Sequence, residues 1–454
     1  MPELDPVAIT REMPAGSLPE RCDVIVAGGG PAGSTAATLL ARLGWSVALL
    51  ERDRHPRFHI GESLLPMNMP ILQRLGVLEA VARIGVLKEG ADFPAPTPEG
   101  YNVFRFERAL DTTWSHAYQV RRDQFDKLLY DNATASGATA FAGHRVTAVQ
   151  LDRDSVVADV RTDDGRTMQC RARYLVDATG RDTLLGSQLR IKRRSRRHQS
   201  AALFAHFRGV RRRAGADAGN VSIYRFDQGW IWLIPLPDDV MSIGAVCWPD
   251  YLKQRRTGNR EFLLQTLHSV PALRQRMENA EIVGHLQATG NYSYSCSRIA
   301  GRRWIMAGDA YAFVDPVFSS GVYLAMHAAE RAAEVVDGAL REPARERALQ
   351  RRYARDVRHG LRTMSWFIYR FTTPAMRKLF AGPRNILKVE QAMISMLSGD
   401  FYRDNGVLWR LRVFKLIYWI AAMGDLRGQV SSFVFRRRQA GAVFSDGINP
   451  QDAA

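Results

Sequence analysis

A glycine-rich turn close to the N-terminus is the feature that most constrains how this chain can fold. The segment Asp23–Ala27 is short, apolar and β-branched, which is typical of a buried parallel strand. It leads into the turn Gly28–Gly33 and then into an alanine-rich segment that predicts a helix to about Leu43. A second apolar run, Val47–Leu50, predicts another strand and is followed directly by Glu51. The order strand, turn, helix, strand predicts a Rossmann-type unit.

The residues of this unit are those that a dinucleotide requires. Gly28 permits the tight turn, Gly30 lets backbone N–H groups approach a pyrophosphate, and Gly33 allows the helix to pack closely on the strand. The helix N-terminus that follows favours the phosphate charge. Glu51 stands where an acid accepts hydrogen bonds from ribose hydroxyls. We therefore expect this part of the chain to bind a dinucleotide.

Two later segments narrow the choice of dinucleotide. Tyr174–Gly180 is an apolar strand that ends with Asp177 and Gly180, and Trp304–Ala310 is another that ends with Gly308-Asp309. The order of these segments resembles the flavoprotein monooxygenase superfamily of p-hydroxybenzoate hydroxylase, over about residues 20–340. The resemblance implies that the dinucleotide is FAD, with Asp177, Gly180, Gly308 and Asp309 among the residues that bind it. It also implies that Arg122 contacts the cofactor, although alone Arg122 would be read as a surface residue of a helix.

Three further motifs indicate a narrower family. They are Gly61–Pro66, which contains Glu62 and Ser63, the W-x-W-x-I-P run Trp230–Pro235, and Phe313–Gly321, which fits F-x-x-P-x-x-S-x-G. Together they resemble the flavin-dependent halogenases of the pyrrole- and phenol-acting branch, some of which act on carrier-protein-tethered substrates. The tryptophan-acting enzymes are longer and carry a glutamate where this chain has Phe318. The resemblance implies that Glu62, Ser63 and Pro316 also belong to the flavin site.

The tryptophan motif has two interpretations. On a strand, Trp230, Trp232 and Ile234 project from one face, and Pro235 ends the pairing. They can form an aromatic core face. The functional alternative is a wall that separates an organic substrate from the flavin and suppresses direct hydroxylation.

The segment 313–321 also has two interpretations. Its last residues, Ser319, Ser320 and Gly321, precede a helix that we predict from about Val322. Free backbone N–H groups at a helix N-terminus form an anion site, so this segment can hold a halide beside the flavin ring. The alternative is a plain helix cap, with Ser319 or Ser320 as the capping residue.

Lys88 lies in the context K-x-G-A-x-F. An isolated lysine is usually solvated at the surface. The context, however, resembles the position of the halogenases' catalytic lysine. An ammonium can polarise hypohalous acid and a neutral amine can carry the halogen as a haloamine, and burial would move the lysine pKa toward neutrality.

These motifs predict an enzyme, an FAD-dependent halogenase. A separate reductase would supply FADH2, which with O2 would oxidise chloride or bromide to hypohalous acid for transfer to an electron-rich aromatic substrate. One alternative is a flavin monooxygenase that hydroxylates an aromatic or polyketide substrate. A second is a non-catalytic flavoprotein scaffold of a biosynthetic complex.

The predicted organisation is α/β. A Rossmann-type FAD-binding domain occupies residues 1–340 and is interleaved with a β-sheet substrate domain formed by about residues 85–165 and 200–290. Residues 341–454 form a helical C-terminal region, with apolar residues at helical spacing in 363–380 and 407–423. The basic, aromatic segment 408–423 is either a helix packed on the substrate domain, a lid, a carrier-protein dock or a peripheral membrane contact.

The net charge of +17 favours an acidic partner such as an acyl or peptidyl carrier protein. No nucleic-acid-binding motif accompanies this charge. No apolar run is long enough to cross a membrane, and the first twenty residues do not resemble a secretory signal. The four cysteines have no metal-binding or redox spacing, so we expect no metal site and a cytoplasmic location.

Overall fold

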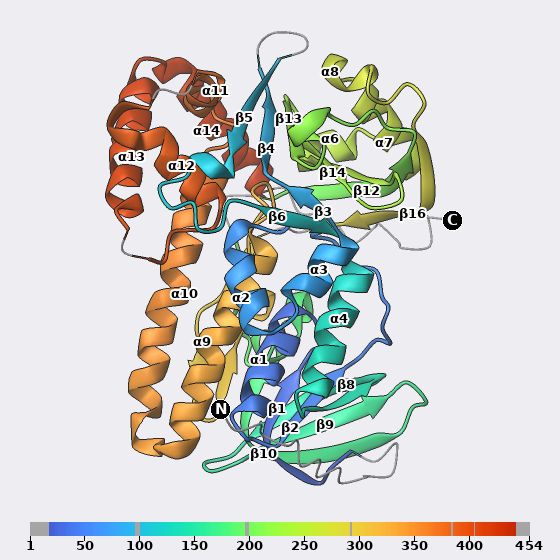
Figure 1. Cartoon of the computed structure of the whole chain (residues 1–454), viewed down its shortest axis with the longest axis vertical. Coiled ribbons are helices and arrows are strands. Elements are labelled where there is room, and N and C mark those ends of the chain that lie inside the picture. Colours follow the sequence, from blue (N-terminus) through green and yellow to red (C-terminus); the bar gives the residue numbers. More distant parts are fainter. Residues whose placement is uncertain are drawn as a thin grey trace, which may run out of the picture.

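Two large β-sheets and a group of C-terminal helices make up the molecule (Figure 1). The computed structural model describes residues 18–441, with the exception of 96–99, 196–198, 291–292, 383–384 and 404. The predicted α/β class is confirmed. The predicted C-terminal region extends to residue 454, and its last residues, 442–454, lie outside the described residues.

The first sheet contains the glycine-rich unit. Its central strands are parallel and lie in the order β19, β10, β1, β2, β7, with Val24 of β1 opposite Tyr174 of β10 and Val47 of β2. Strands β8 and β9 extend β10 as an antiparallel hairpin, and the short β18 closes the other edge. The strands are β1 Arg21–Ala27, β2 Val47–Glu51, β7 Thr139–Ala142, β8 His144–Leu151, β9 Val156–Thr162, β10 Thr167–Asp177, β18 Ala300–Gly301 and β19 Trp304–Met306.

Long helices cover this sheet. The helix α1 packs against both α4 and α9, and α9 packs along α10 (Figure 1). Their bounds are α1 Pro31–Arg42, α4 Arg122–Ala135, α9 Gly321–Arg341 and α10 Glu346–Ile368. The predicted strand–turn–helix–strand unit is therefore present, but α1 begins at Pro31, within the predicted turn Gly28–Gly33.

The second large sheet is mostly antiparallel, in the order β16, β12, β15, β14, β13, β4, β5. The strands are β4 Gly90–Pro94, β5 Tyr101–Arg105, β12 Ala201–Arg208, β13 Val221–Phe226, β14 Gly229–Pro235, β15 Met241–Cys247 and β16 Glu281–Thr289. Along β14 the side chains alternate. Trp230, Trp232 and Ile234 belong to the main core, whereas Ile231 and Leu233 face a second core. This sheet thus presents one face toward the sheet that contains the glycine-rich turn.

The predicted substrate segment 85–165 does not form a single sheet. Strands β4 and β5 join the second sheet, but β7, β8 and β9 join the first. The reason is that β8 and β9 are a hairpin continued by β10, whose far end is the central strand beside β1. The sequence pattern of a strand does not reveal which sheet it joins.

The described part of the C-terminal region, to residue 441, is helical as predicted. The predicted helix 407–423 coincides with α13, but the predicted segment 363–380 is broken between α10 and α11. Pro374 begins α11 and Thr373 caps it by accepting a hydrogen bond from the backbone N–H of Met376. The bounds are α11 Pro374–Ala381, α12 Val389–Leu397, α13 Val407–Met423 and α14 Leu426–Gly441. In this part α13 packs on α11 and α12.

The remaining elements connect these parts. They are α2 Met69–Arg74, α3 Leu78–Ile84, α5 Leu184–Gln188, α6 Pro249–Lys253, α7 Asn259–His268, α8 Pro271–Arg274, β3 Gly85–Lys88, β6 Ala117–Val120, β11 Lys192–Arg194, β17 Tyr294–Cys296 and β20 Ala312–Phe313. The strand β3 pairs with β6 in a separate two-stranded sheet. None of the helices within the described residues is both long enough and apolar enough to span a membrane.

Candidate functional site

A cavity of about 1460 Å³ opens where the carboxyl ends of the central parallel strands meet the second sheet. It exceeds the ~300–1,000 Å³ typical of small-ligand sites, as a dinucleotide requires. Most of the predicted site residues line it: Gly28, Gly30, Glu51, Glu62, Ser63, Arg122, Gly180, Trp230, Trp232, Asp309, Pro316, Ser319 and Gly321. The other predicted residues, Gly33, Lys88, Asp177, Gly308 and Ser320, are outside this lining, and their positions are given below.

The glycine turn approaches the cavity with its backbone. Gly28 has a φ of +103°, and a Cβ there would lie 2.3 Å from the carbonyl oxygen of Ala178. A Cβ on Gly33 would lie 1.7 Å from the carbonyl oxygen of Gly28, so this residue packs α1 onto the turn. Gly30 is different, because the nearest atom to its Cβ would be a guanidinium nitrogen of Arg57 at 3.5 Å. Since the protein itself leaves room there, the absence of a side chain fits close approach by a ligand.

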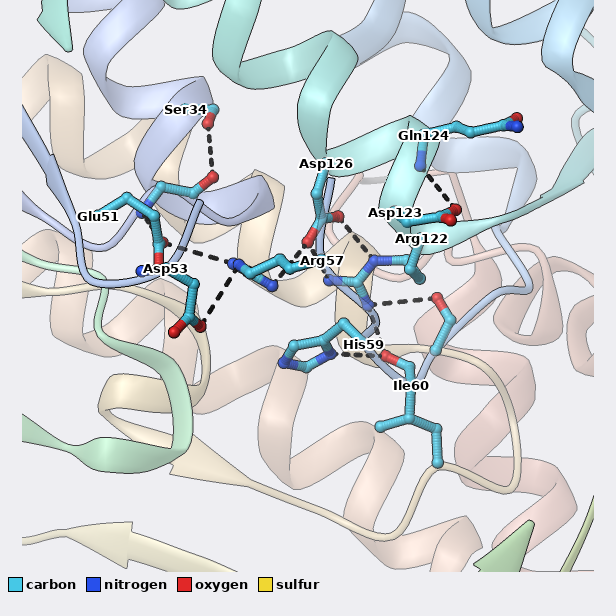
Figure 2. A network of polar contacts seen from close by, with 12 residues as sticks. Ser34, Glu51, Asp53, Arg57, His59, Ile60, Arg122, Asp123, Gln124 and Asp126 are labelled. Carbon is cyan, nitrogen blue, oxygen red and sulfur yellow. Dashed lines mark hydrogen bonds and ion pairs between the residues drawn. The ribbon is translucent and has the colours of Figure 1, made fainter. Parts of the chain in front are cut away.

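Three carboxylates and two arginines form a network beside the turn, with Asp53 at its exposed edge (Figure 2). Glu51 accepts hydrogen bonds from the backbone N–H of Gly29 at 2.6 Å and of Asp53 at 3.0 Å. Arg57 spans the network, with one nitrogen 3.4 Å from Glu51 Oε2 and another 3.4 Å from Asp126 Oδ2. Glu51 therefore lines the cavity with its carboxylate held in place by these contacts.

Arg122 is buried rather than on the surface of its helix. It donates two hydrogen bonds to Asp126, at 2.7 and 3.0 Å, and one to the carbonyl oxygen of Ile60 at 2.6 Å. Burial alone would raise the pKa of Asp126, but the charge and hydrogen bonds of Arg122 outweigh it and lower that pKa. The pair fixes the guanidinium at the cavity wall.

The two acids of the later strands have different environments. Asp177 lies beneath the cavity, and its oxygens accept hydrogen bonds from Thr179 and from the backbone N–H of Leu185. It therefore shapes the turn that presents Gly180. Asp309 faces the cavity, and burial raises its pKa to about 6. Gly308, with a φ of +61°, packs against Ala325 of α9 and turns the chain so that Asp309 is presented.

The segment 313–321 ends at the start of α9, a helix of 21 residues. Ser320 precedes the first helical residue, Gly321, but its side chain makes no capping hydrogen bond. Its hydroxyl is buried and has no hydrogen-bond partner among the described residues. Ser319, with a φ of +55°, and Gly321 both line the cavity. An anion at this helix N-terminus would meet backbone N–H groups that no preceding turn can occupy.

The face of β14 forms one side of the cavity. Trp230, Trp232 and Ile234 all line it, as their alternation on the strand requires. The two indole rings are 5.7 Å apart between centroids, and the Trp232 N–H donates to Ser242 at 3.2 Å. A Cβ on Gly244 of the neighbouring strand would lie 2.3 Å from the Trp232 ring, so a glycine there makes room for this indole. The rings thus form a fixed aromatic surface.

Lys88 ends β3 behind the cavity wall and is only 1% exposed. Its ammonium nitrogen is 2.9 Å from both the Ser63 hydroxyl and the carbonyl oxygen of Leu64, and 5.4 Å from the centre of the Phe106 ring. Burial lowers the pKa of Lys88 to about 7. Because Ser63 lines the cavity, a single hydroxyl joins this lysine to the cavity.

Sequence reasoning missed three residues of the site. Arg57 ties Glu51 to Asp126, His206 shares a hydrogen bond of 2.9 Å with Glu62, and Arg181 lines the cavity and lies over the Phe313 ring. Arg181 follows Gly180 directly, and its adjacency to a predicted cofactor residue was a usable signal. Neither Arg57 nor His206 belongs to a recognisable motif.

Comparison with known proteins agrees with this geometry. Residues 21–363 match the family model described as an FAD binding domain, so the chain is an FAD-binding flavoprotein. It is 33% identical over 329 residues to the 1H-pyrrole-2-carbonyl-(peptidyl-carrier protein) brominase of Pseudoalteromonas luteoviolacea, covering 70% of this chain and 78% of that protein. It is 34% identical over 325 residues to the tryptophan 2-halogenase of Chondromyces crocatus, covering 70% of this chain but only 62% of that protein.

A solved structure gives the same result. The crystal structure of CmlS, a flavin-dependent halogenase, superimposes with a TM-score of 0.74 and 31% identity over 87% of this chain and 70% of that one. The chain belongs to the flavin-dependent halogenases, a family of FAD-dependent oxidoreductases, and its cofactor is FAD.

Proposed function

We propose that this protein uses FADH2 and O2 to chlorinate or brominate an electron-rich aromatic substrate, with Lys88 as the residue that delivers the halogen. The observation that carries the proposal is the environment of Lys88. It is a buried lysine whose hydrogen-bond partners are two neutral oxygens, and one of them belongs to a residue of the FAD cavity. A hydroxylase has no need of such a lysine, because its oxygen transfer takes place beside the flavin.

The predicted cofactor residues would hold FAD along the cavity. The turn at Gly28 and Gly30 and the N-terminus of α1 would receive the pyrophosphate, and Glu51 the ribose. Arg122 and Asp309 would lie along the rest of the cofactor. When bound and reduced by a separate flavin reductase, the cofactor supplies with O2 the oxidising power that converts halide to hypohalous acid. The rest of the proposed cofactor site would be formed by Glu62, Ser63, Gly180 and Pro316.

The N-terminus of α9 is the proposed halide site. Ser319 and Gly321 line the cavity at this helix N-terminus. Ser320, just outside the lining, has a buried hydroxyl without a hydrogen-bond partner among the described residues, and that hydroxyl would donate to the halide. The aromatic substrate would then bind on the side of the cavity that the second sheet forms. In this arrangement Trp230 and Trp232 keep the aromatic substrate off the flavin while hypohalous acid, which is small, passes by.

Lys88 would act on the far side of this wall. With a pKa of about 7, both its forms are populated at neutral pH. The neutral amine would displace water from hypohalous acid and form an N–halogen bond. The ring carbon of the substrate would then take the halogen, and the amine would recover the proton that the ring loses. In the alternative form of the step, the ammonium polarises hypohalous acid through a hydrogen bond, and water leaves.

The relatives support an aromatic substrate tethered to an acidic carrier protein. One of those reported above is named for a pyrrole-2-carbonyl group on a peptidyl carrier protein. The net charge of +17 fits such a partner. The four cysteines are free thiols, which fits a reducing cytoplasm as the place of the reaction.

The test is a halogenation assay with purified protein, a flavin reductase, NADH, FAD, O2 and bromide or chloride. Monochlorodimedone and a simple phenol serve as electron-rich probes, and products are identified by mass spectrometry. We expect halogenated product from the wild type, and a loss of about a hundredfold or more in Lys88→Ala and Lys88→Met, as is typical when a catalytic acid–base group is removed. Lys88→Met preserves the length of the buried chain, so a folded but inactive variant isolates the amine.

Each alternative has its own outcome. Oxygenated product from wild type and both variants alike would identify a hydroxylase and overturn the role of Lys88. Tight FAD binding without any turnover of probe, carrier-tethered pyrrole or carrier-tethered phenol would identify a scaffold.

A further inference from the structure

The helix α13 is apolar on two opposite faces. Its inward face is buried and is formed by Val407, Leu411, Phe414, Tyr418 and Ala422. Its outward face carries Trp409, Leu416, Trp419, Ile420 and Met423, which are 43%, 61%, 50%, 57% and 62% exposed. Single exposed apolar residues are ordinary, but a face of this kind along more than three helical turns marks an interaction surface. Figure 1 places α13 at the outer edge of the molecule.

The exposed apolar surface continues onto α14. Leu426, Val430, Phe433 and Val434 follow one another at helical spacing and are 63%, 59%, 59% and 59% exposed. This helix is held in place on its other side. Gln439 donates to Asp250 at 2.8 Å, and Arg436 donates to the carbonyl oxygen of Tyr369 at 2.9 Å. The exposed residues of the two helices are called the α13–α14 surface below.

Positive charge accompanies this surface. Residues 406–441 contain seven Lys and Arg residues and a single acid, Asp425. Arg412, Arg427 and Arg437 are exposed, and Arg410 lies over the Trp409 ring at 4.3 Å. Long basic side chains of this kind can lay their aliphatic stems on an apolar surface and extend their charge beyond it. The surface is therefore apolar and cationic at once.

We infer that the α13–α14 surface docks this protein onto an anionic phospholipid membrane as a peripheral contact. The apolar side chains would enter the boundary of headgroups and acyl chains, with two tryptophans at the depth that indoles favour. The arginines would meet lipid phosphates, each contributing to binding. A bilayer needs no matching groove, and the outward sides of two helices meet it directly.

Charge decides against a second copy of the chain as the occupant. Self-association through this surface would bring fourteen cations and two acids together, and like charges repel at short range. An acidic protein would also complement the positive charge of this surface. The experiment below distinguishes such a partner from a lipid membrane. The inference is independent of the proposed halogenation.

The experiment is co-sedimentation of the full chain with vesicles, one set of phosphatidylcholine and another of equal parts phosphatidylcholine and phosphatidylglycerol. We expect binding to the anionic vesicles that weakens as salt is raised, with little binding to the neutral ones. Ile420→Glu/Met423→Glu should lower binding about tenfold or more, because it places two anions in the apolar face. Arg412→Gln/Arg427→Gln/Arg437→Gln should lower it by at least about tenfold through lost electrostatic attraction.

A control adds one negative charge elsewhere, where Ile420→Glu/Met423→Glu adds two. Leu43 is 45% exposed at the end of α1, far from α13 in the sequence, and Leu43→Glu should bind vesicles like the wild type. All variants must retain FAD binding, which shows that they are folded. Absent binding to anionic vesicles overturns the inference, as does binding that Leu43→Glu weakens equally.

Two further results would reassign the surface. A dimer that Ile420→Glu/Met423→Glu converts to a monomer, measured by light scattering, would make it a self-association surface. Binding of a purified acidic carrier protein that the same variant abolishes, without vesicle binding, would make it a protein dock.

Discussion

At the scale of single residues, the site contains two buried cations that are stabilised differently. Arg122 is paired with Asp126 by two hydrogen bonds, so its charge is compensated where it lies. Among the described residues, Lys88 has no acid as a partner and donates hydrogen bonds to the neutral oxygens of Ser63 and Leu64. The contribution of each charge to the free energy of unfolding should therefore respond differently to mutation and to pH.

Replacing Lys88 with methionine should stabilise the protein, most of all at low pH. The folded pKa of about 7 lies below the ordinary lysine value of 10.5, so between these values the unfolded chain holds a proton that the folded chain does not. The cost of the buried ammonium is fully present below pH 7 and disappears as pH rises toward the unfolded value. The gain in free energy of unfolding for Lys88→Met should thus be larger at pH 6 than at pH 9, by ~2–3 kcal/mol. Urea unfolding at both pH values measures it, and an equal gain at the two would contradict a depressed pKa.

Replacing Asp126 with asparagine should have the opposite effect. The change leaves the guanidinium of Arg122 buried without its counter-charge, which typically costs ~3–5 kcal/mol. It should also release Arg122 from the cavity wall and weaken FAD binding. Asp131→Asn is the control on the same helix, because Asp131 is exposed and pairs with exposed Lys127, a contact worth at most ~1 kcal/mol. Similar losses in the two variants, in unfolding and in FAD titration, would contradict the assignment.

At the scale of elements, β14 separates two environments by alternation alone. Trp232 faces the cavity, whereas Leu233, the next residue, is buried in the second core. Trp232→Ala should open the proposed wall and raise the share of oxygenated over halogenated product. Leu233→Ala should destabilise the fold by ~2–5 kcal/mol without changing that share. The ratio of oxygenated to halogenated product, measured per FAD-loaded protein, tests this. An unchanged ratio in Trp232→Ala would mean that Trp232 has only a structural role in the core.

The C-terminal helices also show how much of the structure a local sequence pattern predicts. The run Val407–Met423 was predictable as one helix because apolar residues on every side satisfy any helical period. That same uniformity hid which face would be exposed, since exposure depends on the packing of α11 and α12. The pattern through 363–380 suggested one helix, and only the Thr373-Pro374 pair, a cap followed by a residue without an N–H, signalled the break.

The residues of the candidate site also differ in how far a local sequence pattern predicts their contacts. Gly33 packs on Gly28, and Glu51 accepts a hydrogen bond from Gly29, so both contacts lie within one βαβ unit and sequence spacing predicts them. The joining of Lys88 to Ser63 is a contact between β3 and a segment 25 positions earlier, and Arg57 meets Asp126 across 69 positions. Such contacts depend on tertiary structure, and no local pattern encodes them. The resemblance to a family located Lys88, but its burial and its partners came only from the fold.

At the scale of the whole molecule, the excess of 63 Lys and Arg residues over 46 Asp and Glu residues makes the surface basic. Part of that charge lies on α10, which has four exposed arginines: Arg347, Arg351, Arg352 and Arg355. A surface of this sign attracts an acidic partner from a distance comparable with the Debye length, ~10 Å at 0.1 M salt.

If the substrate arrives on an acidic carrier protein, its encounter with the enzyme should therefore be strongly salt-dependent. We expect the association constant to fall about tenfold or more when salt is raised from about 0.05 M to about 0.5 M, chiefly through a slower association rate. Surface plasmon resonance with the loaded carrier measures both rates. An unrelated basic protein of similar net charge is the control, since it should bind the carrier more weakly at every salt concentration. Salt-independent binding would mean that apolar contacts rather than charge select the carrier. No binding at low salt would remove the carrier-tethered substrate from the proposal. The halogenation of free aromatic substrates would still be tested by the Lys88 variants.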